Sequence, residues 1–353
     1  MVLTKKNKIV IFSTTGVIML LLVLLTVITV VANARSTSVK QSSLSFFYVI
    51  PLGTNGGLDE NNLSSYLLTS VNNSIPNSAY ISLDGGTVRH GIEIAIKQQS
   101  LPLNTDKEMF IREQIKAYLI SHGHLDHITG FLINTPNDKS GKFIIGLNQT
   151  IKIIRDHYFN NQAWADFGST GLKTYDYQIL DPLSTISAPI VNTDLDVRIF
   201  RLCHTCPFLS SAFLVSRRNQ PSASILYLGD TGPDDVEKII QADNTTYSPR
   251  YLSQLWKEMA PLVAANQLKA IFIEVSYPNG RPDHLLFGHL TPNWLLKELN
   301  VLKSYHSMEN VKIIVTHIKP ENGAREKIIE QLSRADALHF NFVFPQQGQA
   351  IWL

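Results

Sequence analysis

Three histidines and an aspartate lie within six positions at the end of an apolar run, in the stretch LISHGHLDHITG of residues 119–130. A buried strand excludes such side chains, because a buried polar group without a partner costs on the order of several kcal/mol. His122, His124, Asp126 and His127 therefore mark the point where a core strand delivers polar groups to a site. No other feature constrains the fold as strongly.

The same arrangement recurs, since further apolar runs that resemble buried strands carry titratable residues at their C-terminal ends. These residues are Asp84, His204, Asp230, Glu274 and His317. Solid apolar strands that alternate with helical segments predict an α/β fold with sheets covered by helices. Ligand sites in such proteins lie beyond the strand ends. We therefore expect these residues to meet in one site.

Periodicity and capping residues place the other elements. Helices are predicted at 91–99, 107–114, from about Ile128, at 233–242, 250–266 and 321–335, and after Thr291 as N-cap with Pro292 at the first helical position. The late segments FVF and AIWL are expected to form a short closing pair of strands. Because no repeat or linker divides the body, one domain is predicted over residues 35–353.

The N-terminus differs in kind from this body. Three lysines precede an unbroken apolar run from Ile9 to Val31, followed by Ala-Asn-Ala at residues 32–34. These are the parts of a secretory signal peptide, so residues 1–34 are predicted to be removed after Ala34. The run at 9–31 is also long enough to remain as a membrane anchor. In either case the lysines direct the body out of the cytoplasm, so a periplasmic or secreted protein is expected.

Charge narrows the range of partners. Residues 1–34 hold three of the 31 lysines and arginines and none of the 29 acidic residues, so the remainder has a net charge of about −1. A near-neutral body without a basic cluster argues against long nucleic acid as a partner. The oligomeric state is not predicted.

Imidazole and carboxylate groups are good ligands for divalent transition metals such as zinc. His122 and His124 are two positions apart, so on an extended segment they point to the same side. Asp126 and His127 follow where the chain turns into a helix and can reach a second ion. The donors thus divide into two sets with Asp230 between them: His122, His124 and His204 for one ion, and Asp126, His127 and His317 for the other.

These residues also carry a family resemblance. The stretch HGHLDHITG is similar to the signature of the class II cyclic nucleotide phosphodiesterases, a branch of the metallo-β-lactamase fold superfamily. Further stretches match in the same order over about residues 44–320: LGTNGG, SSYLL, LDGGT, GDTGPD, FIEVSYPN, GHLTP and VTHIKP. The histidine motif alone indicates the superfamily, and the other stretches narrow it to this branch.

The resemblance implies a four-layer αβ/βα sandwich that holds two divalent ions, usually zinc, between two sheets. It implies hydrolysis of 3′,5′-cyclic nucleotides, with cyclic AMP as the expected substrate and cyclic GMP as a further candidate, to 5′-nucleotides by a hydroxide that the ions share. The sequence does not choose between adenine and guanine. It assigns the two ligand sets given above and makes Asp84 a residue that orients ligands. The catalytic candidates are Asp126, Asp230 and His289.

Several assignments stay open. His289 is predicted to contact the substrate phosphate or base, or alternatively to cap the following helix. Glu274 either lies behind the metal ligands or pairs with a lysine or arginine. Tyr66, Phe287 or one of the tryptophans could stack on a base, and the sequence does not choose among them.

Cys203 and Cys206 flank His204 in RLCHTCP, which departs from the pattern expected of the family. They form a disulfide that stiffens the loop, remain two inert thiols, or ligate metal directly. The third alternative would put the assignment of His204 in doubt.

Fold alone does not determine substrate. The alternatives are another hydrolase of this fold, namely a lactonase, a thioesterase or an RNA phosphodiesterase, and a non-catalytic nucleotide-binding protein. The near-neutral charge disfavours RNA, and export disfavours cytosolic thioester work. A full ligand set with a bridging carboxylate disfavours a protein that only binds. Hydrolysis of a small cyclic nucleotide is therefore the predicted activity.

Overall fold

The computed structural model describes residues 45–218, 222–321, 323–334 and 340–353. The segment predicted as a signal peptide or anchor, residues 1–34, lies outside these ranges. Within them, no helix combines the length and the apolar character that crossing a bilayer requires.

The N-terminal half, together with the last strand β17, builds one sheet with the strand order β17-β1-β2-β4-β5-β6-β7, and β3 pairs with β2. Neighbouring strands from β4 to β7 run parallel. The residues that follow β4 and β5, including Asp84 and His122, therefore lie at one edge of this sheet. Its strands are β1 (Phe47–Gly53), β2 (Ser65–Asn72), β3 (Ile75–Pro76), β4 (Tyr80–Leu83), β5 (Ile115–Leu119), β6 (Lys142–Gly146), β7 (Tyr175–Ile179) and β17 (Ile351–Trp352).

The C-terminal half builds a second sheet with the order β16-β15-β14-β11-β10-β9-β8. Strands β11, β14, β15 and β16 run parallel, so Asp230 and His317 follow strands that end at one edge. The strands are β8 (Ala188–Pro189), β9 (Leu195–Cys203), β10 (Leu209–Arg217), β11 (Ser224–Leu228), β14 (Leu268–Glu274), β15 (Lys312–Thr316) and β16 (Asn341–Val343). A separate hairpin joins β12 (Ile239–Ile240) and β13 (Thr246–Tyr247).

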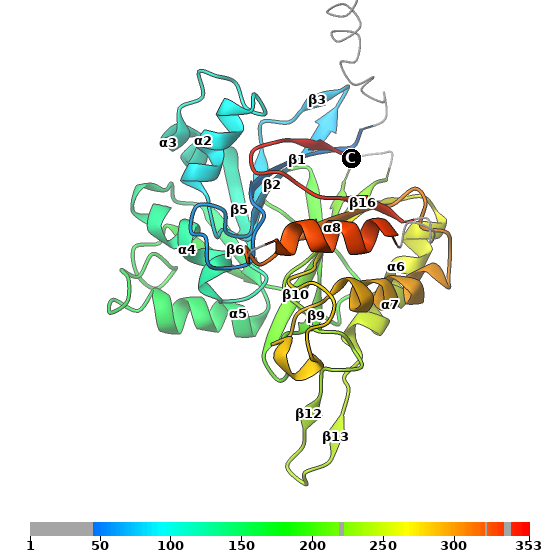
Figure 1. Cartoon of the computed structure of the whole chain (residues 1–353). Helices are drawn as coiled ribbons and strands as arrows, with labels where there is room; N and C mark the ends of the chain where they lie inside the picture. Colours follow the sequence, from blue (N-terminus) through cyan, green and yellow to red (C-terminus); the bar gives the residue numbers. More distant parts are fainter. Residues whose placement is uncertain (1–44, 219–221, 322, 335–339) are drawn as a thin grey trace, which may run out of the picture. The chain divides into compact units, whose positions relative to one another are not determined.

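Helices cover the outer face of each sheet, and the inner faces pack together (Figure 1). Apolar side chains such as Phe213 and Phe272 fill the space between the sheets. The first sheet carries α2 (Arg89–Lys97), α3 (Lys107–Met109), α4 (Leu125–Asn134) and α5 (Asn148–Ile153), and the second carries α6 (Tyr251–Ala264), α7 (Pro292–Lys303) and α8 (Ala324–Arg334). Short helical turns are η1 (Phe110–Gln114), η2 (Thr135–Asn137), η3 (Ile154–Tyr158) and η4 (Asp283–Leu285). The predicted four-layer αβ/βα sandwich is confirmed.

Three expectations about elements were wrong. Residues 233–242 form a turn that leads into β12, because the Asp234 carboxylate accepts the backbone N–H groups of Leu252 and Ser253 in the first turn of α6. The segments FVF and AIWL do not pair with each other, because β16 extends the second sheet and β17 extends the first. Helix α4 begins at Leu125 rather than near Ile128.

Candidate metal centre

The loop between β5 and α4, together with the first turn of α4, presents the histidine cluster. His122 and His127 are buried, whereas His124 is exposed and the Asp126 side chain is 19% exposed. The helix lies close against the loop that follows β4, since the Gly85 N–H donates to the His127 carbonyl at 2.7 Å. This contact sets the start of α4 beside Asp84.

The predicted residues come together from both sheets. The donor atoms of one group lie within 4.8 Å of one another, and the same holds for a second group that shares Asp230. The first group is His122, His124, His204 and Asp230, and the second is Asp126, His127, Asp230 and His317. The grouping is the one that the sequence predicted, and the role of these residues as ligands stays a prediction.

Asp230 lies between the two groups. Its Oδ1 is 3.3 Å from His127 Nε2, and its Oδ2 is 3.2 Å from His317 Nε2. The same Oδ2 is 3.7 Å from His122 Nε2 and 3.8 Å from His204 Nε2. One carboxylate therefore faces imidazoles of both groups, as a bridging ligand must.

The residues fit two divalent ions. His122 Nε2 is buried and has no hydrogen-bond partner in the described part of the chain. Such an orphan costs about 1–3 kcal/mol unless a ligand satisfies it. Across the centre, the Nε2 atoms of His127 and His317 approach to 3.1 Å, an arrangement in which at most one nitrogen can donate to the other. Inward nitrogens beside two carboxylates are the donor set of a divalent transition metal.

Asp84 positions two imidazoles through their outer nitrogens, the Nδ1 atoms that point away from the centre. It contacts one of them directly and the other through a serine. His127 Nδ1 donates to Asp84 Oδ2 at 2.8 Å. Ser121 Oγ donates to the same oxygen at 2.8 Å and accepts from His122 Nδ1 at 3.0 Å. The Tyr227 hydroxyl also donates to Asp84, at 2.7 Å. Because both Nδ1 atoms carry protons in this network, both Nε2 atoms offer lone pairs to the centre.

Glu274 repeats this arrangement on the second sheet. His289 Nδ1 donates to Glu274 Oε1 at 2.8 Å. Ser276 Oγ donates to Glu274 Oε2 at 2.6 Å and accepts from His317 Nδ1 at 3.0 Å. Glu274 thus lies behind the centre and pairs with no lysine or arginine among the described residues. The alternative that His289 caps the following helix is wrong, because its Nδ1 is engaged by Glu274 and Thr291 is the N-cap of α7.

Burial and charge set the protonation of the centre. Burial lowers the pKa of His122 well below its ordinary value and lowers the pKa of His204 to about 4. Burial alone would raise the pKa of Asp230, but the His317 and His127 rings hold it well below its usual range. The first group thus offers neutral imidazoles and an ionised carboxylate, the forms that bind metal.

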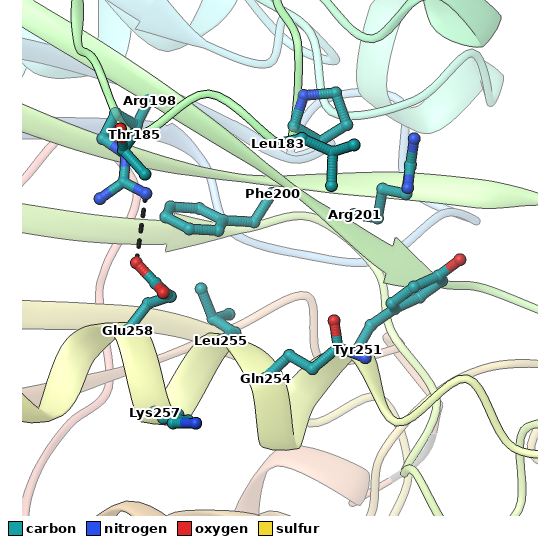
Figure 2. A pocket seen from close by; sticks show the side chains of 11 residues that line it. Leu183, Thr185, Arg198, Phe200, Arg201, Tyr251, Gln254, Leu255, Lys257 and Glu258 are labelled. Atoms are coloured by element: carbon teal, nitrogen blue, oxygen red, sulfur yellow. Dashed lines mark hydrogen bonds and ion pairs between the residues drawn. The ribbon is translucent and has the colours of Figure 1, made fainter.

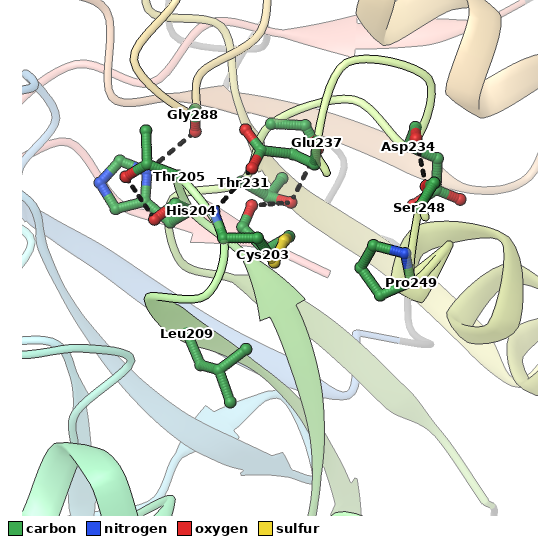
Figure 3. Close-up of a disulfide and its surroundings, with 12 residues drawn as sticks. Cys203, His204, Thr205, Leu209, Thr231, Asp234, Glu237, Ser248, Pro249 and Gly288 are labelled. Carbon is green, nitrogen blue, oxygen red and sulfur yellow. Dashed lines mark hydrogen bonds between the residues drawn. A yellow bond between two sulfur atoms is a disulfide. The ribbon is translucent and has the colours of Figure 1, made fainter. Parts of the chain in front are cut away.

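His204 is held by a cross-linked loop at the end of β9 (Figure 3). Its Nδ1 donates to the Gly288 carbonyl at 2.9 Å, and a side chain on Gly288 would lie 2.6 Å from that nitrogen. Cys203 and Cys206 form a disulfide, so neither thiol is free and neither sulfur competes with His204 as a ligand. Behind the loop, the buried Glu237 carboxylate accepts the Cys206 N–H at 2.8 Å.

The sequence did not identify Ser121, Ser276, Tyr227 or Glu237 as parts of the site. Only the two serines left a signal, because each stands within two positions of a predicted residue, His122 or Glu274. His289 lies between the two groups, with its ring centroid 4.9 Å from that of His204 and 5.2 Å from that of His317. Tyr66 is fully buried and cannot stack on a base.

A two-sheet sandwich with two groups of histidines and carboxylates at the sheet edges is the arrangement of the metallo-β-lactamase fold. Residues 46–348 match the family of class-II cAMP phosphodiesterases, and the chain belongs to that family. The chain is 36% identical, over 86% of its length and 92% of the relative, to a 3′,5′-cyclic-nucleotide phosphodiesterase of Aliivibrio fischeri. A relative of the same description from Schizosaccharomyces pombe is 30% identical, over 86% of this chain and 92% of its own.

A solved structure of similar fold is unliganded yeast PDE1, with a TM-score of 0.73 and 22% sequence identity. The similarity covers 88% of this chain and 100% of that one. At this identity the likeness concerns the fold.

Proposed function

We propose that this chain hydrolyses 3′,5′-cyclic nucleotides, cyclic AMP and also cyclic GMP, to 5′-nucleotides with two zinc ions as cofactors. The observation that carries the proposal is the pair of donor groups that share Asp230. They occur in a chain of the class-II family whose relatives in Aliivibrio fischeri and Schizosaccharomyces pombe are described as 3′,5′-cyclic-nucleotide phosphodiesterases.

The ions, when bound, supply an acidified water near neutral pH and neutralise charge on the phosphoryl oxygens. The chain's own residues prepare for this. Asp84 and Glu274 retain the protons on the outer nitrogens of their imidazole partners, so the inner nitrogens stay available. The side chains of His122 and Asp230 are buried, so bulk water has little access to them. His289 lies beside both groups, where we assign it to contact with the substrate phosphoryl group.

The body is proposed to act outside the cytoplasm, in the periplasm or secreted. The basis is the sequence of residues 1–34, with lysines, an apolar run and a small-residue site. Fractionation of cells that express the full chain, with N-terminal sequencing of the product, tests this. A product that begins after Ala34 outside the cytoplasm is expected. A full-length cytoplasmic product would contradict the proposal.

A substrate panel tests the activity. The purified protein, loaded with zinc, is assayed with cyclic AMP, cyclic GMP, an acyl-homoserine lactone and bis(p-nitrophenyl) phosphate. Release of a 5′-nucleotide from the cyclic nucleotides is expected to dominate. Strong lactone turnover without cyclic nucleotide hydrolysis would contradict the proposal, and nucleotide binding without either reaction would indicate a protein that only binds.

A further inference from the structure

A cavity of about 410 Å³ opens beside the second donor group. Asp126 belongs both to its wall and to that group. The volume falls within the range of about 300–1,000 Å³ that small-molecule pockets occupy. The other residues of the wall are Gly57, Leu58, Glu60, Leu63, Leu125, Thr129 and Lys319.

Lys319 brings a positive charge to this wall. Lys319 follows His317 by two positions, in VTHIKP. The segment after β15 therefore places both the His317 imidazole and the Lys319 ammonium group near the centre. A side-chain carbon built on Gly57 would lie 3.7 Å from Lys319 Nζ and 3.6 Å from Asp126 Oδ2. No hydrogen bond or ion pair engages the Lys319 ammonium within the described ranges, so it is available to an anion.

Two leucines give the cavity an exposed apolar lining. Leu58 is 79% exposed and Leu125 is 60% exposed, so both present apolar surface to a ligand in the cavity. Leu58 also has a φ of 62°, in the left-handed region that a leucine rarely adopts. Strained backbone of this kind persists where the surroundings impose it and concentrates at ligand sites. Glu60 adds a hydrogen-bond acceptor to the same wall.

We propose that this cavity holds the nucleotide, with the Lys319 ammonium on the phosphate and Leu58 and Leu125 against the nucleoside. The proposal rests on the proposed function, because it takes the substrate to be a cyclic nucleotide whose phosphate lies at the metal centre. It adds Lys319 as a substrate-binding residue and Leu58 as a contact to the nucleoside. The ammonium group of Lys319 would bind the one anionic group of such a ligand, its phosphate. The apolar surface beside it would contact the flat ring system of the base.

The chain offers matched controls in a second cavity, of about 310 Å³, between α6, β9 and the loop around Leu183 (Figure 2). Lys257 on α6 and Leu183, which is 76% exposed, line that cavity as Lys319 and Leu58 line the first. Another of its cations, Arg198, is paired with Glu258 at 3.2 Å, and none of the residues that line this cavity belongs to a donor group.

Calorimetry measures how tightly the zinc-loaded full chain binds 5′-AMP, adenosine and inorganic phosphate. The same measurements are made on the variants Lys319→Ala, Lys319→Arg and Leu58→Ala. Lys319→Ala is expected to weaken binding of 5′-AMP and phosphate by tenfold or more, because a charge-assisted hydrogen bond is lost, and to leave adenosine unchanged. Lys319→Arg should restore most of the affinity. Leu58→Ala should weaken 5′-AMP and adenosine and spare phosphate.

Lys257→Ala and Leu183→Ala are expected to match the wild type with all three ligands, and zinc content should be equal in every variant. Unchanged 5′-AMP affinity in Lys319→Ala, or a loss of the same size in Lys257→Ala, would overturn the inference. The KM for cyclic AMP, measured in parallel, should rise in Lys319→Ala. If the wild type binds 5′-AMP as described but turns over no cyclic nucleotide, the proposed function fails and the assignment of the cavity stands.

Discussion

Asp84 and Glu274 show how much a single residue determines at this centre, because each holds one histidine directly and a second through a serine. The histidines and carboxylates could be predicted because titratable residues are conspicuous after apolar strands. Ser121 and Ser276 could not, because a serine near a strand end is ordinary and its partner becomes known only in the folded chain.

Asp126→Ala is expected to abolish turnover and lower the metal content while the fold persists. The side chain is a donor of the second group and is partly exposed, so no core packing depends on it. Metal analysis, steady-state kinetics and circular dichroism check this. Wild-type rates in the variant would refute the assignment of Asp126.

Ser276→Ala is expected to weaken binding of the second metal ion by about tenfold or more, because partners behind the ligands typically contribute that much. The change leaves His317 Nδ1 and Glu274 Oε2 without their shared hydroxyl. Zinc competition with a chromogenic chelator measures the affinity. Ser210→Ala is the control, since that buried hydroxyl has no partner in the described part of the chain. Equal affinities in the two variants would contradict the prediction.

At the scale of elements, sequence patterns predicted helices and strands correctly where a segment's own pattern decides its structure. They failed where contacts with distant parts of the chain decide it. Helix α6 was predicted from its periodicity, and the strand β15 from the solid apolar run that precedes His317. The helix expected at 233–242 does not form, because Asp234 engages α6 and Glu237 turns toward the loop of His204. Strands β16 and β17 were expected to pair, but the open edges of two different sheets receive them.

Burial of Glu298 between α7 and α6 makes the stability of the fold depend on pH. Glu298 on α7 accepts from Trp256 Nε1 on α6 at 3.2 Å, and burial, followed by the charge of Asp234, raises the pKa of Glu298 to about 7. The folded chain therefore holds the Glu298 proton more tightly than the unfolded chain, in which the pKa is about 4.5. The stability that this protonated carboxyl contributes is complete below pH 4.5 and is lost as the pH rises through 7. The loss is on the order of 3 kcal/mol at most.

Urea unfolding of the wild type and Glu298→Gln between pH 5 and pH 8.5 checks this. The free energy of unfolding should fall with pH less steeply in the variant. Glu258→Gln, at a carboxylate on the exposed side of α6, should retain the wild-type slope. A Glu298→Gln slope identical to that of the wild type would show that this carboxyl does not titrate in the range.

At the scale of the whole molecule, the centre joins the two sheets, because the loop after β5 and the ends of β9, β11 and β15 all contribute donors. The layer order followed from the family resemblance, whereas periodicity alone gave only sheets covered by helices. How residues 1–34 are processed stays a prediction, since they lie outside the described residues.

Removal of the ions is therefore expected to lower the thermal midpoint by on the order of 10 °C, because ligands that bind only the folded state stabilise it. Calorimetric scans with and without EDTA measure this shift. Asp230→Asn, which lacks the shared carboxylate, should respond much less to EDTA. A wild-type midpoint that does not change with EDTA would mean that no ion links the sheets.

The central claim is that seven side chains from both sheets hold two ions that cleave a cyclic phosphodiester. The most direct measurement combines metal analysis with 5′-AMP release from cyclic AMP on the same preparation, titrated with zinc from the metal-free state. Activity is expected to rise with zinc and to saturate at two ions per chain. Saturation of both sites with no 5′-AMP formed would contradict it.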